Sequence, residues 1–163
     1  MKTLLRSLLY LALIVWLGAE ILFPVVAVTA FGTLRGDTHA AGMIVGSVLH
    51  TLHNMGLIAG LVALALLALA PAWHIYKPRS VLAPMAILLL MIILTAYSQY
   101  GIIPAMERDR IAAGGAIDVA LETSAPVADF NRLHVRSERV EQAVLLLGVA
   151  AVVLVACAET TRA

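Results

Sequence analysis

The groups of this chain best suited to chemistry are histidine and glutamate side chains that lie in or beside long apolar stretches. Imidazole and carboxylate groups are ligands for zinc, copper and iron, and within a membrane they also carry protons. Placing one ionised side chain at the centre of a bilayer costs about 2.5–3.5 kcal/mol on insertion scales, so a group of them requires mutual hydrogen bonds, a bound ion or water. The six residues predicted to act together as metal ligands are Glu20, His50, His53, His134, Glu138 and Glu141.

Three kinds of site fit such residues. The first is a divalent metal ion held by imidazole and carboxylate groups. The second is a haem or another cofactor, since two histidines from different helices can hold a haem iron axially. Its predicted binding residues are His53, His134, Tyr97 and Tyr100. The third is a chain of Glu, His and Tyr side chains that passes protons. The sequence has no His-x-x-x-His or Cys-x-x-Cys spacing, so no short motif supports the metal site, and it has no nucleophile motif, so an enzyme is not the favoured interpretation.

The composition is typical of a membrane protein. Of 163 residues, 62% are hydrophobic and 13% are charged, whereas about 25% of the residues of a soluble domain are charged. The net charge of +1 excludes nucleic acid as a partner, because nucleic-acid binding needs a strongly basic surface. The single cysteine, Cys157, excludes an internal disulfide and a cysteine metal motif. The lipid bilayer is therefore the expected partner, and the bacterial inner membrane is the expected location.

Four apolar stretches are long enough to span a bilayer, at about 3–31, 39–70, 80–106 and 127–159. Roughly 20 apolar residues in a helix cross the hydrocarbon core, which is about 30 Å thick. The sequence thus predicts an all-α, polytopic membrane protein, with one domain over residues 1–163 that forms a four-helix transmembrane bundle. The first stretch begins like a signal peptide, but it exceeds the usual apolar segment of about 7–15 residues, so it is predicted to stay as the first helix.

The expected helices bring the polar residues to one half of the bundle. The link at 32–38 is so short that the first two helices are predicted to be antiparallel neighbours. Glu20 lies 11 residues before Phe31, and His50 lies 11 residues after His39, which predicts a similar depth for the two side chains. Four more polar residues fall in the same half, namely Asn54, Tyr97, Gln99 and Tyr100.

Glycines follow one side of the second predicted helix. At about 100° per residue, one face carries Gly42, Gly46, His53, Gly56 and Gly60. Small residues four apart let a neighbouring helix approach closely in lipid. This side, including His53, is therefore predicted to face protein.

The last predicted helix carries its charges on two sides. One side has a histidine and two glutamates, and the other has three arginines. The first set is His134, Glu138 and Glu141, and the second is Arg132, Arg136 and Arg139. This segregation predicts that the His/Glu side faces the bundle and that the arginines reach lipid headgroups or water.

The distribution of basic residues gives an orientation. Five basic residues lie on the side of the termini, namely Lys2, Arg6, Lys77, Arg79 and Arg162, whereas the far side carries Arg35, Arg108 and Arg110. Because short cytoplasmic loops carry an excess of Lys and Arg, both termini are predicted to lie in the cytoplasm.

Short motifs along nearly the whole chain resemble a known family. They are Trp16-Leu-Gly18-Ala-Glu20-Ile-Leu-Phe23, Gly42-x-x-x-Gly46 with His53, Ile103-Pro104-Ala-Met106 with Arg108, and Phe130-x-x-Leu133-His134-x-x-Ser137. Together they resemble the transmembrane protein 205-like family of small four-helix membrane proteins. That resemblance implies the architecture and the importance of these positions. More remotely the chain resembles the copper-resistance D-like membrane proteins, which implies metal or haem handling, although it lacks the Met-rich and His-rich tracts expected of copper carriers.

The functional prediction depends on the polar residues predicted within the membrane. An intramembrane His/Glu site is predicted to bind a metal ion or haem, or to relay protons. A structural accessory subunit is the alternative, in which the polar cluster fixes helix register and the glycine faces dock a partner. A redox enzyme that uses bound haem is a third hypothesis. The expected partners are further copies of the chain or a larger membrane complex.

Overall fold

The protein is a bundle of four long helical rods in the computed structural model, which describes residues 2–160. α1 (Lys2–Thr33) and α2 (Thr38–Leu69) form a hairpin, and α5 (Ala125–Thr160) is the last rod. The third rod consists of α3 (Leu82–Tyr97), the π-helical segment η1 (Ser98–Ile102) and α4 (Ile103–Ala112). All four rods are long and apolar enough to cross a membrane. The predicted all-α, four-helix transmembrane fold is therefore confirmed.

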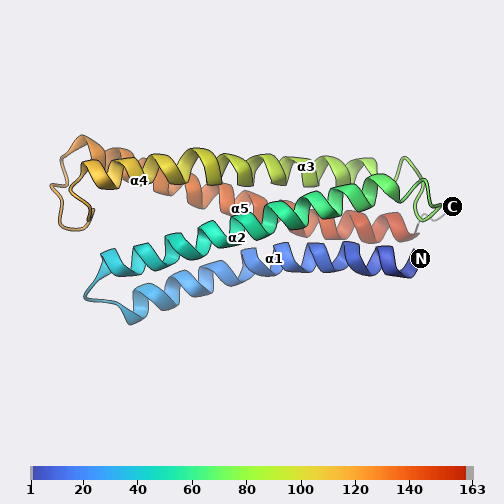
Figure 1. Cartoon of the computed structure of the whole chain (residues 1–163), viewed down its shortest axis with the longest axis horizontal. Helices are drawn as coiled ribbons and strands as arrows, with labels where there is room; N and C mark the ends of the chain where they lie inside the picture. The colour runs from blue at the N-terminus through green and yellow to red at the C-terminus, as the bar shows by residue number, and fades with distance from the viewer. Residues whose placement is uncertain (1, 161–163) are drawn as a thin grey trace.

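The two ends of the bundle differ in how closely the rods lie. The start of α1 and the end of α5 share one end, called here the terminal end, and the connections 34–37 and 113–124 form the loop end (Figure 1). Toward the loop end the α1–α2 hairpin diverges from α4 and α5 (Figure 1). α1 has 32 residues and is about 48 Å long at about 1.5 Å per residue. The rods therefore extend well beyond a hydrocarbon core about 30 Å thick.

The apolar core fills the terminal half of the bundle. All four rods contribute to it, and its most enclosed side chains are Leu9, Trp16, Ala63, Leu67, Leu88, Met91, Val144, Ala151 and Val155. These positions recur at helical spacing along each rod, because one stripe of each helix faces its neighbours. The core reaches from the terminal end to the level of Trp16, where polar side chains begin.

Trp16 packs into the glycine face of α2. Its indole is 1% exposed, and it lies directly against Gly56 and Gly60. The prediction that this face contacts protein is confirmed for these two glycines and for His53, all of which are buried. Gly42 and Gly46, by contrast, are exposed, and a side-chain carbon added at either would meet no atom within 4 Å, because the hairpin has diverged from the other rods there.

A polar contact closes the terminal end of the bundle. The Tyr76 hydroxyl donates to Glu159 Oε1 at 3.1 Å, and the Arg6 guanidinium lies 5.9 Å from the centre of the Tyr76 ring. Burial, and then the neighbouring charge of Glu159, raise the pKa of Tyr76 to about 12. The connection between α2 and α3 is thereby attached to the last turn of α5.

Tyr76→Phe is expected to lower the free energy of unfolding by about 1.5–3 kcal/mol, the usual contribution of a hydrogen bond to a charged group. In the native protein this contribution is complete below about pH 10, the pKa of an unfolded tyrosine. It is lost as the pH rises through about 12, the pKa of folded Tyr76. Thermal unfolding in detergent from pH 8 to 12 measures both effects. Tyr100→Phe, at an exposed tyrosine, is the control, and an equal loss in both variants would refute this role for Tyr76.

Candidate functional site

His53 lies at the centre of a hydrogen-bonded cluster just beyond the apolar core. Its side chain, on α2, is 1% exposed, and both ring nitrogens have partners. Nδ1 lies 3.0 Å from Gln99 Oε1, and Nε2 lies 2.9 Å from Glu141 Oε1. The histidine therefore joins α2 to η1 and to α5.

The π-helical segment supplies two of the partners. Ser98 and Gln99 are buried, and the N–H of Ile103 bonds to the carbonyl of Ser98, five residues earlier. Pro104 gives a reason for this widened turn, because its ring would clash with the carbonyl four residues before it in an α-helix and it has no N–H to donate. Single π-helical turns inside α-helices occur frequently at functional sites. Here the turn presents two consecutive polar side chains to the bundle interior.

Gln99 connects the two histidines of α2. Its amide nitrogen lies 2.8 Å from His50 Nδ1 and 3.4 Å from Asn54 Oδ1. With the amide in this orientation, His50 Nδ1 accepts a hydrogen bond and His53 Nδ1 must donate one to the amide oxygen. Reversal of the amide would exchange both roles, so the Gln99 orientation couples the proton positions of the two rings.

One proton lies between the His53 imidazole and the Glu141 carboxyl group. A carboxylate oxygen and an imidazole nitrogen form a hydrogen bond only if one of them carries hydrogen. The proton therefore lies on Nε2, as an imidazolium and carboxylate, or on the carboxyl group, as a neutral pair. Ser98 Oγ donates to the same Glu141 oxygen at 3.1 Å, which favours the carboxylate form because that oxygen then accepts two hydrogen bonds. The Glu141 side chain is 13% exposed.

Glu20 brings the remaining rod into the cluster. This acid, on α1, is 9% exposed, and it interacts electrostatically with His53 and Glu141. The Trp16 indole N–H lies close to the Glu20 carboxyl group without the geometry of a hydrogen bond. Trp16 Nε1 and the Thr95 hydroxyl are buried polar atoms with no hydrogen-bond partner among residues 2–160. A second carboxyl group thus stands beside the His53–Glu141 pair inside the bundle.

Comparison with known proteins places the chain in a family. Residues 11–111 match the family described as a domain of unknown function, DUF4149. The chain belongs to this family. The DUF4149 match includes Glu20, His53 and Gln99 and ends before α5 and Glu141. No curated protein and no solved structure matches the chain, and the resemblance to the transmembrane protein 205-like and copper-resistance D-like families stays a prediction.

His134 and Glu138 of this DUF4149 chain lie outside the cluster. Their side chains are 55% and 58% exposed and contact each other at 3.4 Å, and the His134 ring stacks on Phe130. The prediction that the side of α5 carrying His134 faces the bundle is therefore wrong for these two residues and holds for Glu141. The α1–α2 hairpin diverges from α4 and α5 toward the loop end (Figure 1), which accounts for the exposure of these two side chains. Tyr97 and Tyr100 are also exposed.

The described residues do not fit a metal ion or an axial haem. No three His, Cys, Asp or Glu side chains within residues 2–160 are arranged to hold a metal. Both nitrogens of His53 are engaged by Gln99 and Glu141, and His134 lies on the exposed side of α5. The six predicted ligands are thus divided into a buried group of Glu20, His53 and Glu141, the exposed neighbour His50, and the separate His134–Glu138 pair.

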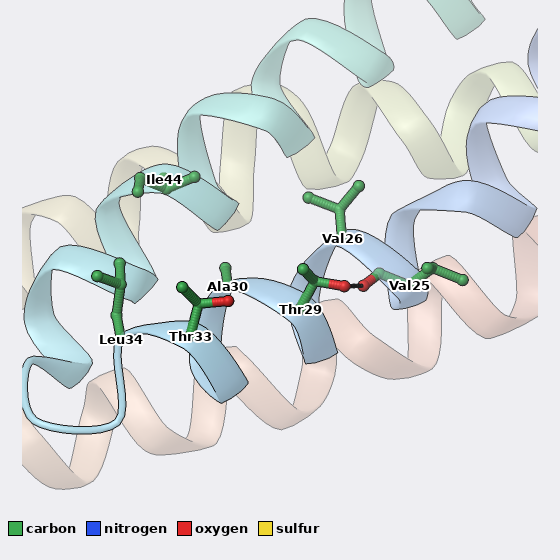
Figure 2. Close-up of a pocket in the computed structure, with 7 residues that line it drawn as sticks. All are labelled: Val25, Val26, Thr29, Ala30, Thr33, Leu34 and Ile44. Carbon is green, nitrogen blue, oxygen red and sulfur yellow. Dashed lines mark hydrogen bonds between the residues drawn. The ribbon is translucent and has the colours of Figure 1, made fainter.

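An apolar groove between the ends of α1 and α2 is a poor candidate for chemistry. Figure 2 shows the side chains that line it, which are Val25, Val26, Thr29, Ala30, Thr33, Leu34 and Ile44. The Thr29 hydroxyl donates to the carbonyl of Val25 at 2.7 Å. Since none of these seven side chains titrates near neutral pH, the His53 cluster is the stronger candidate site.

Gln99 and Ser98 are the members of the cluster that the sequence did not assign to the site. The sequence predicts both residues in the polar last third of their helix, at this end of the bundle, without giving either a role. One sequence pattern could have pointed to these two residues. They are consecutive polar residues after a long apolar run, and Gly101 and Pro104 follow them. Glycine and proline at this spacing indicate an irregular helical turn.

Proposed function

We propose that this protein binds and releases a proton at the His53–Glu141 pair, which lies near the loop-end boundary of the hydrocarbon core. The proposal depends on the 2.9 Å contact between Nε2 and Oε1, because a proton in such a contact moves between two groups with little displacement of either. Gln99 holds the other ring nitrogen, so the ring is fixed with Nε2 directed at the acid. Histidine and acidic residues paired inside membranes are the usual carriers of protons there.

Access to the pair comes from the loop end. On the terminal side lies the apolar core, in which Leu88, Met91 and Val144 are at most 1% exposed. On the loop side lie the charged first half of α5 and the exposed His50. A proton that reaches Glu141 from the loop end has Glu20 as its next acceptor. The pair therefore supports one-sided uptake, which suits a protein that senses protons or couples them to a partner.

Gln99 acts as a positioning residue in this proposal. A carboxamide does not readily gain or lose a proton near neutral pH, so the path runs from His53 through Glu141 toward Glu20 and not through Gln99 to His50. The amide instead fixes the ring orientation and links the proton positions of the two histidines. Hydrogen-bonded partners that orient an imidazole in this way are common at functional histidines.

Infrared difference spectra between acidic and alkaline pH, recorded on the protein in lipid bilayers, test the proposal. Protonation of Glu141 is expected to give a carboxylic-acid carbonyl band that accompanies a change in imidazole bands. Both changes are expected to disappear in Glu141→Gln and to remain in Glu138→Gln, which alters an exposed acid on the same helix. A spectrum that Glu141→Gln leaves unchanged would overturn the proposal.

A structural accessory subunit is the second candidate, since the same hydrogen bonds connect α2, η1 and α5. In that case Glu141→Gln would reduce stability, while the native protein would show no reversible carboxyl band between acidic and alkaline pH. The two measurements together separate the candidates.

The proposal also includes the orientation of the protein in the membrane and its partners. Lys2, Arg6, Lys77 and Arg79 belong to the terminal end, which supports an orientation with both termini in the cytoplasm of a bacterium. Arg162, the fifth basic residue of this prediction, lies outside the described residues. Further copies of the chain or a larger membrane complex are proposed as the partners that respond to the bound proton.

A further inference from the structure

Two arginines on α5 are exposed and have no acidic partner among the described residues. Arg132, Arg136 and Arg139 follow one another at helical spacing and are all exposed. Arg132 is paired with Asp129 at 2.7 Å. Arg136 contacts only the Tyr97 hydroxyl, at 3.3 Å, and Arg139 has no ion pair or hydrogen bond with residues 2–160. Two guanidinium groups thus remain free to bind an anion.

The free arginines lie at the expected level of lipid headgroups. The apolar part of α5 begins at Ala143, and the apolar part of α3 ends before Tyr97. Counting 20 residues back from Thr160 reaches Val140, a rise of about 30 Å at about 1.5 Å per residue, which equals the thickness of a hydrocarbon core of about 30 Å. Tyr97 and Tyr100 are 45% and 68% exposed at this level. Exposed tyrosines and arginines together are typical of a membrane interface.

The surface between the arginines has a suitable shape. Arg132, Val135, Arg136 and Arg139 line a surface hollow of about 360 Å³. Guanidinium groups bind phosphate through paired N–H donors, and the exposed Val135 side chain offers an apolar contact beside them. We propose that this hollow binds the phosphate headgroup of an anionic phospholipid, with Arg136 and Arg139 on the phosphate oxygens and Val135 against the carbon atoms of the headgroup.

The proposal selects a lipid and not a dissolved anion because the hollow combines cationic and apolar groups at the membrane interface. It is independent of proton binding by His53 and Glu141. Each arginine that bonds directly to the phosphate is expected to contribute about fivefold in affinity, which corresponds to about 1 kcal/mol, the usual net contribution of a hydrogen bond. Loss of both free arginines is therefore expected to weaken binding about 25-fold.

Thermal unfolding in an uncharged detergent tests this site when phosphatidylglycerol is titrated into the micelles. The native protein is expected to be stabilised at low lipid fractions, with about 25-fold more lipid needed in Arg136→Gln/Arg139→Gln. Arg35→Gln/Arg108→Gln removes the same charge from exposed positions outside the hollow and is expected to behave like the native protein. Arg136→Lys, which keeps the charge but loses the paired donors, is expected to fall between them.

Three results would overturn the proposal. The first is equal stabilisation of the native protein and of Arg136→Gln/Arg139→Gln by phosphatidylglycerol. The second is equal stabilisation by phosphatidylcholine, and the third is the same stabilisation by inorganic phosphate, which would indicate a site for dissolved anions. Native mass spectrometry, which counts retained phosphatidylglycerol molecules in the native protein and in Arg136→Lys, gives the same decision if the double variant does not fold.

Discussion

Replacement of His53 by leucine is expected to lower the free energy of unfolding by about 3–5 kcal/mol, the range seen when one member of a buried ion pair is removed. Leucine is close to histidine in size, so packing changes little. It leaves Gln99 Oε1 without its donor and the Glu141 carboxylate with only Ser98, in a position that is 13% exposed. Unfolding of the protein in mixed micelles, with increasing denaturing detergent, measures the loss.

The size of this loss decides what kind of contact His53 makes. Ordinary hydrogen bonds between transmembrane helices contribute about 0.6 kcal/mol on average and about 1.7 kcal/mol at most. A loss of about 3 kcal/mol or more would therefore indicate an ionised pair. His134→Leu, at a histidine that is 55% exposed, is the matched control, and its effect is expected to stay within about 0.5 kcal/mol. Equal losses in the two variants would contradict the central position of His53.

Gly60→Val is expected to cost about 3 kcal/mol, at the upper end of the range for overpacked cores. A side-chain carbon at Gly60 would overlap Cζ3 of Trp16 and would lie 3.0 Å from Cγ1 of Ile92. Because the Trp16 ring is rigid and 1% exposed, it has no free space to move into. α1 and α2 must separate, and the same unfolding experiment measures the cost.

Gly46→Val is the control for this prediction. Gly46 lies on the same predicted face of α2, but a side-chain carbon there would meet no atom within 4 Å. Its substitution is therefore expected to leave stability within about 0.5 kcal/mol of the native value. If Gly60→Val were no more harmful than Gly46→Val, the packing of Trp16 against α2 would not be the contact that joins the hairpin.

The four rods could be predicted because hydrocarbon thickness constrains the length of apolar stretches. The expected helices 39–70 and 127–159 correspond closely to Thr38–Leu69 and Ala125–Thr160. The third rod extends further than the predicted end at 106, to Ala112, since its last residues are charged and no apolar signal marks them. Its π-helical turn also escaped prediction, because regular helical periodicity was expected to continue through Pro104.

Helical periodicity placed residues on the correct sides of the helices but could not show which sides are covered. His134, Glu138 and Glu141 share a side of α5, yet only Glu141 lies deep enough to meet another rod. Gly42 and Gly46 likewise contact no other helix among the residues that the structure describes. The divergence of the α1–α2 hairpin at the loop end (Figure 1) results from packing among all four rods, which no single helix encodes.

The position of a side chain along the bundle axis could be predicted better than whether a neighbouring helix covers it. The reason is that each turn fixes the register of the two helices it joins. Counting from the turn between α1 and α2 predicts that Glu20 lies near the histidines of α2, and in the structure Glu20 is buried and interacts electrostatically with His53. The chemical role of these side chains stays a prediction, because hydrogen-bond partners such as Ser98 depend on the unexpected π-helical turn.

Solid-state NMR of the protein in lipid bilayers, with nitrogen-15 in the histidine rings and carbon-13 in the glutamates, tests the shared proton most directly. The account predicts one hydrogen signal correlated with both Nε2 of His53 and the carboxyl carbon of Glu141, and a change in the position of that hydrogen as the pH is varied. A His53 ring whose Nε2 shows no coupling to any glutamate carboxyl group, with signals that Glu141→Gln leaves unchanged, would contradict it.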